Sequence, residues 1–353
     1  MTSRRPASLT VALATPLAPD LRHLITDVDP GIELLADDDL LPPQRYPGDH
    51  GGDPAYRRTP AQDNAFRSLL GRAEVLYGIP DVDSKLLADT VAANPRLRWV
   101  QTMAAGGGAS VKEAGLSEHD LGRVVFTTSA GVHGDTLAEF AVFGVLAGAK
   151  DLPRLRQLQA AHSWPERWAM RQVREQIVLV VGLGGIGAAT ARLLKGLGAT
   201  VLGVKRTVGP VDSVDEVHPV SALRELVGRA DAIVFTLPGT ESTAGLYDAE
   251  LIAATKPGAV IVNVGRGSVI DEPALIAGLS SGHLRSAFLD VVAAEPLPAD
   301  SPLWDLSNVV IAPHTAALNE AEDRRIAELF AENLRRFLAG SDLINVVDPA
   351  EFY

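Results

Sequence analysis

Short apolar runs alternate with helical patterns along most of the chain, an arrangement typical of parallel α/β sheets that are covered on both faces. The pattern occurs in two separate regions, and the first covers roughly residues 8–133. Its strand candidates are Leu9–Thr15, Ile32–Leu35, Val75–Tyr77, Trp99–Thr102 and Val124–Thr127. The segment Ala36–Asn64 is polar and has no apolar periodicity, so we expect a long loop or a partly ordered insertion there.

The second region is more regular, and six apolar runs are separated by stretches of helical character. These runs are Ile177–Val181, Thr200–Val204, Ala232–Leu237, Ala259–Val264, Ala287–Val291 and Val309–Ala312. Six such strands make a full doubly wound sheet. Amphipathic helices are expected on either side of it, over Thr136–Leu152 and Glu320–Leu338, and an extended segment over Ile344–Tyr353. The sequence therefore predicts an α/β protein with two doubly wound, Rossmann-like sheets.

Composition narrows the classes of function. The chain has 353 residues, enough for about two domains at roughly 150 residues each. It has no cysteine, which excludes disulfides, thiolate metal sites and cysteine nucleophiles, and we expect no metal. Acidic residues number 44 against 32 basic ones, a net charge of −12, so nucleic acids and anionic membranes are poor candidate partners. An anionic ligand would have to meet positive charge that is placed locally.

The N-terminus contains the elements of an export signal. Arg4-Arg5 precedes the apolar stretch Leu9–Leu17, as in twin-arginine signals. The stretch is short and two prolines interrupt or follow it, so a first buried strand is the simpler interpretation. The apolar run Leu137–Ala149 is also shorter than the roughly 20 residues that span a bilayer. We expect a cytoplasmic protein.

A glycine-rich turn follows the first strand of the second region and precedes a helical stretch, Ala188–Lys195. The turn reads Gly182-Leu-Gly184-Gly185-Ile186-Gly187. Gly182 would permit the tight turn, Gly184 the close approach of a pyrophosphate, and Gly187 the packing of helix on strand. The pyrophosphate would lie on the helix N-terminus, where free N–H groups favour anions. The alternative is that these glycines serve strand–helix packing alone.

The next strand ends in Lys205-Arg206-Thr207, and Lys205 lies 18 residues after Gly187. An acidic residue at this strand end would bind the ribose 2′-hydroxyl of NAD, whereas basic residues would pair with a 2′-phosphate. The sequence therefore predicts a preference for NADP(H), with NAD(H) as the alternative cofactor. The competing interpretation is a solvated basic pair at a strand end.

Three chemically capable residues come just after later strands of this region: Arg266, Glu295 and His314. Open α/β sheets bind ligands at this carboxyl edge. Each residue alone could be an ordinary surface or structural side chain, but their joint placement favours a site. Histidine suits proton transfer, a neighbouring carboxylate stabilises the imidazolium, and arginine can hold a carboxylate bidentately. These are the groups that the reduction of a 2-oxo acid requires, together with a hydride donor.

The chain resembles the D-isomer-specific 2-hydroxyacid dehydrogenases, a family that includes glyoxylate/hydroxypyruvate reductases. The motifs that carry the resemblance are Gly182–Gly187, Asn263–Asp271, Leu289–Val291, Glu295–Pro298, Pro302–Trp304 and Pro313-His314. Arg266 and Glu295 are 29 positions apart and Glu295 and His314 are 19 apart, which matches the spacing of the family. The resemblance covers about residues 95–345.

The resemblance implies a role for each candidate. Arg266 would bind and orient the substrate, His314 would be the acid/base, and Glu295 would be the carboxylate partner of His314. Ala105 and Gly106 match a substrate loop whose backbone N–H groups meet the substrate carboxylate. The expected cofactor-binding residues are Gly182, Gly184, Gly185, Ile186, Gly187, Lys205, Arg206, Thr207, Leu237, Pro238, Val264 and Asp290, the last of which would hold the nicotinamide carboxamide.

The chain also departs from the family. Many members have aspartate where Gly108 stands, and Gly or Ser often follows the histidine where Thr315-Ala-Ala317 stands here. These differences leave the identity of the 2-hydroxy acid open.

Family topology implies that residues 134–318 form a cofactor domain inserted into a flavodoxin-like substrate domain of residues 1–133 and 319–353. The active site would lie in the cleft between them, and two chain crossings would allow hinge closure. Members commonly form homodimers through an arm that corresponds to Ala161–Trp168. Trp164 and Trp168 are candidate interface anchors, or else they pack within one subunit.

The expected function is the NADP(H)-linked reduction of a small 2-oxo acid such as glyoxylate or hydroxypyruvate. A phosphite-type dehydrogenase on the same scaffold remains an alternative, whereas formate enzymes of the family carry glutamine where Glu295 stands. A phosphoglycerate dehydrogenase usually has an acidic residue at the strand end where Lys205 lies. A different class of function is a non-catalytic, dinucleotide-sensing corepressor or scaffold, which the complete set of Arg266, Glu295 and His314 disfavours.

Overall fold

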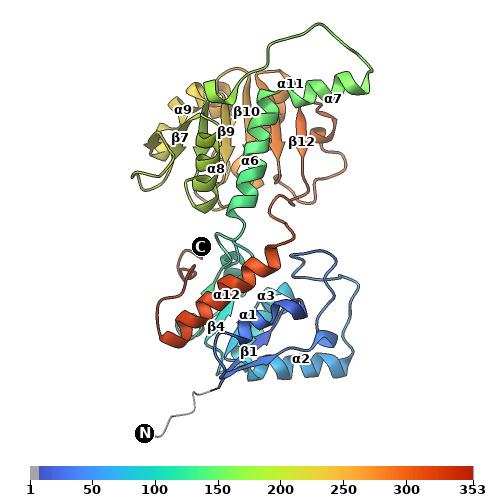
Figure 1. The fold of residues 1–353 in the computed structure, drawn as a ribbon, viewed down its shortest axis with the longest axis vertical. Helices are drawn as coiled ribbons and strands as arrows, with labels where there is room; N and C mark the ends of the chain where they lie inside the picture. Colours follow the sequence, from blue (N-terminus) through green and yellow to red (C-terminus); the bar gives the residue numbers. More distant parts are fainter. Residues whose placement is uncertain (1–7, 353) are drawn as a thin grey trace. The chain divides into compact units, whose positions relative to one another are not determined.

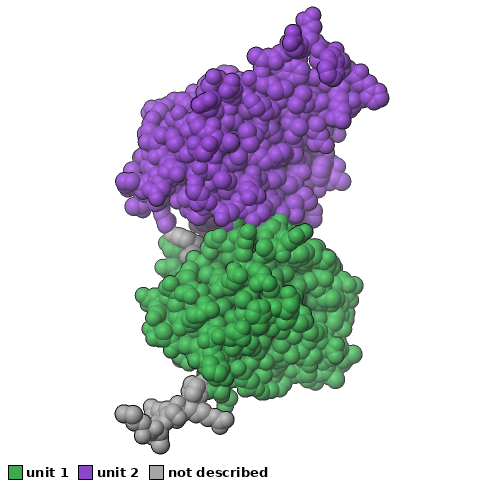
Figure 2. Space-filling model, viewed as in Figure 1, with its two compact units in different colours: residues 1–133, 318–353 green, residues 134–317 purple. Residues whose placement is uncertain are grey.

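The computed structural model describes residues 8–352 of the chain. Within that range the chain forms two compact units (Figure 2). Unit 1 contains the residues up to His133 and those from Leu318 onward, and unit 2 is the continuous segment Gly134–Ala317. The chain therefore passes twice from one unit to the other, at 133/134 and at 317/318.

Unit 1 is built on a five-stranded parallel sheet in the order β2-β1-β3-β4-β5. Its strands are β1 Leu9–Leu13, β2 Ile32–Leu35, β3 Val75–Tyr77, β4 Trp99–Gln101 and β5 Val125–Thr127. Its helices are α1 His23–Thr26, α2 Pro60–Arg72, α3 Ser84–Ala93, α4 Gly108–Glu113, α5 Glu118–Arg123 and α12 Glu322–Ala339 (Figure 1). The long helix α12 packs against the sheet through Phe330, whose ring stacks on Trp99 with centroids 4.8 Å apart.

Unit 2 is built on a seven-stranded parallel sheet in the order β12-β11-β10-β9-β6-β7-β8. Its strands are β6 Ile177–Val181, β7 Thr200–Val204, β8 Glu216–His218, β9 Ala232–Phe235, β10 Ala259–Asn263, β11 Leu284–Leu289 and β12 Val309–Ile311. Its helices are α6 Gly134–Ala149, α7 Leu152–Ala160, α8 Gly185–Gly196, α9 Leu223–Arg229, α10 Ala249–Ala254 and α11 Glu272–Ser280. Apolar clusters bury both faces, which explains why most of these strands are continuous apolar runs.

The predicted fold class, two doubly wound α/β sheets, is confirmed. The order of the first sheet is the flavodoxin-like one, and the second contains the Rossmann order. In the second sheet β6 lies between β7 and β9, so the direction in which strands are added reverses at β6. This switch point is where such sheets bind dinucleotides at their carboxyl edge.

Several elements differ from the sequence prediction. The edge strand β8 was missed because its three residues, Glu-Val-His, are all only partly buried and do not form an apolar run. Strand β11 begins at Leu284 rather than at Ala287. Helix α2 begins at Pro60, inside the segment that was expected to be a loop, because Thr59 and Gln62 form a capping box.

The two ends of the chain also qualify the prediction. Beyond residue 344 the chain is not extended throughout: Val346 makes one antiparallel bridge to Thr127, and turns surround it. Arg4 and Arg5 lie outside the described residues, whereas the apolar stretch that follows them forms strand β1. Across residues 8–352, the structure contains no helix whose length and apolar character would let it cross a membrane.

Candidate active site

The glycine turn has the geometry that a pyrophosphate-binding turn needs. Gly182 has a φ of 102°, in the left-handed region that favours glycine, and α8 begins three residues later. A Cβ on Gly187 would lie 1.9 Å from the carbonyl oxygen of Gly182, so the helix approaches the strand end as only glycine allows. Gly184 and Gly185 are exposed, and a Cβ on either would meet no atom within 4 Å. The first turn of α8 is therefore open to an anion.

The basic strand end lies beside β8. The backbone N–H of Lys205 donates to the carbonyl oxygen of His218 at 3.0 Å, which fixes the chain where β7 ends. Within the described residues, the ammonium group of Lys205 has no hydrogen bond or ion pair with the protein. Arg206 and Thr207 are exposed. The positive charge of Lys205 is thus available to a ligand at the carboxyl edge.

Arg266 lies in a turn after β10 that contacts two neighbouring turns. A Cβ on Gly265 would lie 2.5 Å from the carbonyl oxygen of Leu237, after β9. A Cβ on Gly267 would lie 1.8 Å from the carbonyl oxygen of Val292, after β11. The glycines on both sides of Arg266 are therefore required for three strand ends to meet. The arginine itself is exposed, and its guanidinium donates to the carbonyl of Gly265 at 2.8 Å.

His314 and Glu295 form the central contact of the site. The imidazole Nδ1 of His314 and the carboxylate Oε2 of Glu295 are 2.7 Å apart. The other carboxylate oxygen accepts the backbone N–H of Val292 at 3.2 Å, which holds Glu295 in place. The side chains are 45% and 37% exposed, so the pair lies at the surface of unit 2. Because Nδ1 is paired with Glu295, Nε2 is the ring nitrogen of His314 that could exchange a proton with a ligand.

The backbone holds His314 in an uncommon conformation. Its φ is 51°, in the left-handed region. The N–H of His314 donates to the carbonyl of Asp290 at 2.9 Å, so the turn after β12 is attached to the turn after β11. Such strain persists only where the surroundings determine it, and it is concentrated at functional sites.

Asp290 is the buried acid of the site, with 2% of its surface exposed. Its Oδ1 atom accepts the backbone N–H groups of Thr315 and Ala316, each at 2.9 Å. Its Oδ2 atom is buried and has no hydrogen-bond partner within the described residues. Burial raises the pKa of Asp290, although the two backbone hydrogen bonds oppose that rise. A buried oxygen without a partner is what a site for a carboxamide would present.

The remaining expected cofactor residues are distributed around the same edge. The side chain of Leu237 lies beside Gly182, and Pro238 is exposed. Ile186 is partly buried in the first turn of α8. The side chain of Val264 is 2% exposed and belongs to the apolar core, so only its backbone could contact a cofactor.

The expected substrate loop lies in unit 1, after β4. The carbonyl oxygen of Ala104 accepts hydrogen bonds from the N–H of Gly107, the hydroxyl of Thr102 and the N–H of Ser129, at 3.2, 3.2 and 3.4 Å. This carbonyl points into the unit, whereas Ala105 and Gly106 are exposed. Within the described residues, their N–H groups have no protein acceptor. They form a small set of open backbone donors, which suits a carboxylate.

Sequence reasoning missed Ser129, which supports this loop. Besides its backbone contact, its hydroxyl donates to the carbonyl of Thr102 at 2.9 Å. Ser129 lies 27 positions from Thr102 in the sequence, and no local pattern links the two. The pairing of β4 with β5 brings them together.

Comparison with known proteins identifies the family of this chain. Residues 142–316 match the family model described as D-isomer specific 2-hydroxyacid dehydrogenase, NAD binding domain. The glyoxylate/hydroxypyruvate reductase B of Yersinia pestis is 32% identical over 298 residues, which cover 82% of this chain and 89% of that protein. The chain belongs to the D-isomer-specific 2-hydroxyacid dehydrogenase family. The resemblance found in the sequence is confirmed.

Members of this 2-hydroxyacid dehydrogenase family also share the whole fold. The crystal structure of a D-isomer-specific 2-hydroxyacid dehydrogenase from Xanthobacter autotrophicus Py2, in complex with NADPH and MES, superposes with a TM-score of 0.77. It is 32% identical, and the match covers 98% of this chain and 100% of that one. The D-3-phosphoglycerate dehydrogenase of Mycobacterium tuberculosis is 35% identical over 287 residues. That match covers 78% of this chain but only 53% of the relative, so the chain spans about half the length of those dehydrogenases.

Proposed function

We propose that this chain reduces a small 2-oxo acid, of the glyoxylate or hydroxypyruvate type, to the D-2-hydroxy acid, with NADPH as the preferred cofactor and NADH as the alternative. The observation that carries the proposal is the 2.7 Å contact between His314 and Glu295. It lies at the carboxyl edge of a Rossmann sheet, beside the turn that carries Arg266 and the buried Asp290. The bound nicotinamide would supply the hydride.

The proton comes from His314. During reduction the Nε2 atom of the imidazolium gives a proton to the carbonyl oxygen of the substrate, while carbon 2 receives the hydride. Glu295 accepts the hydrogen bond from Nδ1, so it selects the tautomer and stabilises the charged ring between turnovers. In the reverse direction the neutral imidazole removes the proton of the 2-hydroxyl group.

Two sets of groups are proposed to bind the carboxylate of the substrate: the guanidinium of Arg266 and two backbone N–H groups. Arg266 is exposed at the carboxyl edge and can pair with a carboxylate or polarise the adjacent carbonyl. The open N–H groups of Ala105 and Gly106 in unit 1 would receive the same carboxylate. We infer that residues 134–317 bind the cofactor and that the remaining residues contribute to binding the substrate.

The preference for NADPH rests on Lys205, whose ammonium has no partner within the described residues, and on the adjoining Arg206 and Thr207. The related Xanthobacter enzyme crystallised with NADPH is consistent with it. A charge-assisted hydrogen bond is worth about 1.5–3 kcal/mol. Lys205→Glu should therefore raise KM for NADPH roughly 10- to 100-fold and leave KM for NADH unchanged or lower. An unchanged KM for NADPH would contradict the role of Lys205.

A steady-state assay that follows NADPH and NADH at 340 nm tests the proposed reaction. Glyoxylate, hydroxypyruvate and larger 2-oxo acids are each offered with both reduced cofactors. D-3-phosphoglycerate and phosphite are offered with both oxidised cofactors. Some relatives are named D-3-phosphoglycerate dehydrogenase, and a phosphite-type dehydrogenase on the same scaffold remains an alternative. We expect the highest kcat/KM for a small 2-oxo acid with NADPH.

Other outcomes would replace the proposal with a named alternative. Preferred turnover of phosphoglycerate or phosphite would change the substrate class and retain the mechanism. Tight cofactor binding with no turnover on any acid would favour a dinucleotide-sensing scaffold. A clear preference for NADH would contradict the cofactor assignment alone.

A further inference from the structure

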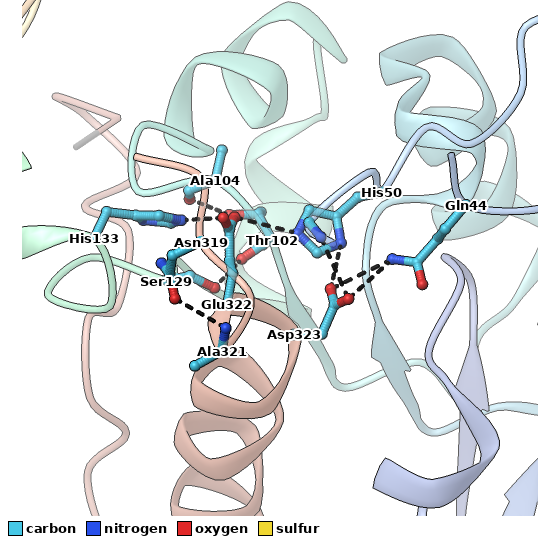
Figure 3. Close-up of polar contacts among 11 residues, drawn as sticks. Gln44, His50, Thr102, Ala104, Ser129, His133, Asn319, Ala321, Glu322 and Asp323 are labelled. Carbon is cyan, nitrogen blue, oxygen red and sulfur yellow. Dashed lines mark hydrogen bonds and ion pairs between the residues drawn. The ribbon is translucent and has the colours of Figure 1, made fainter. Parts of the chain in front are cut away.

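A largely buried polar cluster lies in unit 1, which contains none of the proposed catalytic residues (Figure 3). We define the acid–imidazole cluster as Gln44, His50, His133, Glu322 and Asp323. The two acids begin helix α12, and His133 is the last residue of unit 1 before the chain enters unit 2. Gln44 and His50 come from the polar segment between β2 and α2, for which the sequence suggested no role.

Glu322 is the centre of the cluster and is only 3% exposed. Its Oε1 atom lies 3.0 Å from Nε2 of His133, which is 7% exposed, and 3.8 Å from Nε2 of His50. Burial by itself would raise the pKa of Glu322, but the two imidazoles outweigh it and lower that pKa to about 2. The carboxylate is therefore charged, and it holds His133 by a charge-assisted hydrogen bond.

The polar segment is attached to the same helix end. Asp323 accepts the backbone N–H of Gly48 at 3.3 Å and the side-chain amide of Gln44 at 3.3 Å, and it lies 3.9 Å from His50. A Cβ on Gly48 would lie 2.8 Å from the carboxyl carbon of Glu322. Segment and helix thus approach as closely as glycine permits. The segment Ala36–Asn64, for which we expected a long loop or a partly ordered insertion, makes ordered contacts with Glu322 and Asp323.

His133 connects this cluster to the substrate loop. It ends a turn that begins at Ser129, closed by the N–H of Val132 donating to the carbonyl of Ser129 at 3.2 Å. Ser129 in turn contacts Thr102 and Ala104, which place the open N–H groups of the loop. Figure 3 shows these residues next to His133 and Glu322. Glu322 is the only side chain that His133 contacts by hydrogen bond or ion pair within the described residues.

Stability alone explains such a cluster poorly. The free energy needed to remove two charges from water is about as large as the free energy gained when they form a buried ion pair. Replacing the whole pair by apolar residues is therefore often neutral or stabilising. Buried charged networks are better suited to holding one arrangement of the chain. In this unit the arrangement that is held is the turn on which the substrate loop rests.

We propose that Glu322 is a positioning residue: by holding His133 it fixes the turn 129–133, and this turn keeps the N–H groups of Ala105 and Gly106 aligned for the substrate carboxylate. The inference rests on the proposed function, because it takes the substrate to be a carboxylate bound by this loop. His50 and Asp323 support Glu322 from the polar segment. None of these residues touches the reacting atoms in the proposed mechanism.

Kinetics of Glu322→Gln give the first test, with Glu332→Gln as the matched control, since Glu332 lies on the same helix in a partly exposed pair with Arg336. We expect KM for the 2-oxo acid to rise roughly tenfold in Glu322→Gln, with kcat changed less, because ground-state binding is lost. The Kd for NADPH, measured by fluorescence, should stay within about twofold, since the proposed cofactor residues all lie in unit 2. Glu332→Gln should change neither.

Two substitutions of His133, the hydrogen-bond partner of Glu322, test the same contact. His133→Ala should raise KM as Glu322→Gln does, whereas His133→Gln, which keeps an N–H donor, should restore much of the loss. If Glu322→Gln does not fold, this pair decides the question. Equal KM values for His133→Ala and the wild type would overturn the proposal.

Hydrogen exchange gives a readout that needs no activity. In Glu322→Gln, the backbone amides of residues 102–110 and 129–133 should exchange about tenfold faster than in the wild type, while those of β1 and β3 keep their rates. Unchanged exchange in a folded variant would overturn the positioning role. If the wild type reduces no 2-oxo acid but exchange still responds, the proposed function fails while the link between cluster and loop stands.

Discussion

The chemistry of this site depends on which side chains and backbone groups come within hydrogen-bonding distance of one another. The carboxylate of Glu295 meets His314 at 2.7 Å because the turns after β11 and β12 are joined through Asp290. Gly265 and Gly267 contribute by lacking side chains, since a Cβ at either position would overlap a neighbouring backbone. The roles of Arg266, Glu295 and His314 stay predictions until variants are measured.

The proton-transfer role of His314 is testable by substitution. Without a general acid, His314→Ala should lose roughly 10²- to 10⁴-fold in kcat while the Kd for NADPH changes little. Arg266→Ala should lower kcat/KM mainly through the KM for the 2-oxo acid. His119→Ala, at an exposed histidine of α5, is the control. Wild-type kcat/KM in both site variants would contradict the assigned mechanism.

At the scale of elements, the candidate functional residues lie at helix ends and strand ends. The first turn of α8 is open to a pyrophosphate, whereas α12 begins with two buried acids, Glu322 and Asp323, that belong to the acid–imidazole cluster. Acidic residues at a helix N-terminus are favoured by the helix dipole. Glu322 and Asp323 therefore stabilise α12 as well as orienting His133.

This arrangement predicts a pH dependence of stability. The pKa of Glu322 is lowered from 4.5 to about 2 in the folded chain, where it faces His50, His133, Asp323 and the hydroxyl of Tyr77. The contribution of the ionised carboxylate is fully present above about pH 4.5 and is lost as the pH falls towards 2. A shift of this size corresponds to about 3 kcal/mol between the ionised and the protonated carboxyl in the same site.

Urea unfolding between pH 7 and pH 3 measures this contribution. The free energy of unfolding of the wild type should fall with pH more steeply below 4.5 than that of Glu322→Gln. Glu328→Gln, at an exposed position of the same helix, should follow the wild type in this comparison. Parallel curves for the wild type and Glu322→Gln would show that the carboxylate of Glu322 gains nothing from its imidazole partners.

At the scale of the whole molecule, the chain forms two compact units, and each unit contains some of the residues proposed to bind ligands.

The segment after α7 contains the two tryptophans that were candidate interface anchors. Trp164 is 99% exposed, whereas Trp168 is partly buried and lies under the guanidinium of Arg154, 4.1 Å from the ring centroid. The two tryptophans therefore differ: Trp168 packs within its own chain, whereas Trp164 is almost fully exposed.

We expect a homodimer in which Trp164 is an interface anchor. Size-exclusion chromatography with light scattering should give twice the chain mass of 37.3 kDa for the wild type. Trp164→Glu should shift the population towards the monomer, and Leu338→Glu, at an exposed apolar position of α12, should not. A monomeric wild type would contradict the expected homodimer.

The sequence by itself determined most of the fold and the composition of the site. Buried parallel strands must be apolar throughout, so their runs are visible in the sequence, and the glycine turn and the three catalytic candidates follow strand ends. Elements without such a signal were missed or misplaced. Strand β8 is short and half exposed, and the start of α2 depends on a capping box inside a polar segment.

Only the tertiary structure decided how distant segments support one another. The contact of Ser129 with Ala104, the docking of Gly48 on Glu322 and the bond between Glu322 and His133 join residues 25 to 274 positions apart. Such contacts depend on strand pairing and helix packing and leave no periodic pattern in the sequence. The sequence therefore determined which groups could perform the chemistry, and the fold decided which side chains hold them in place.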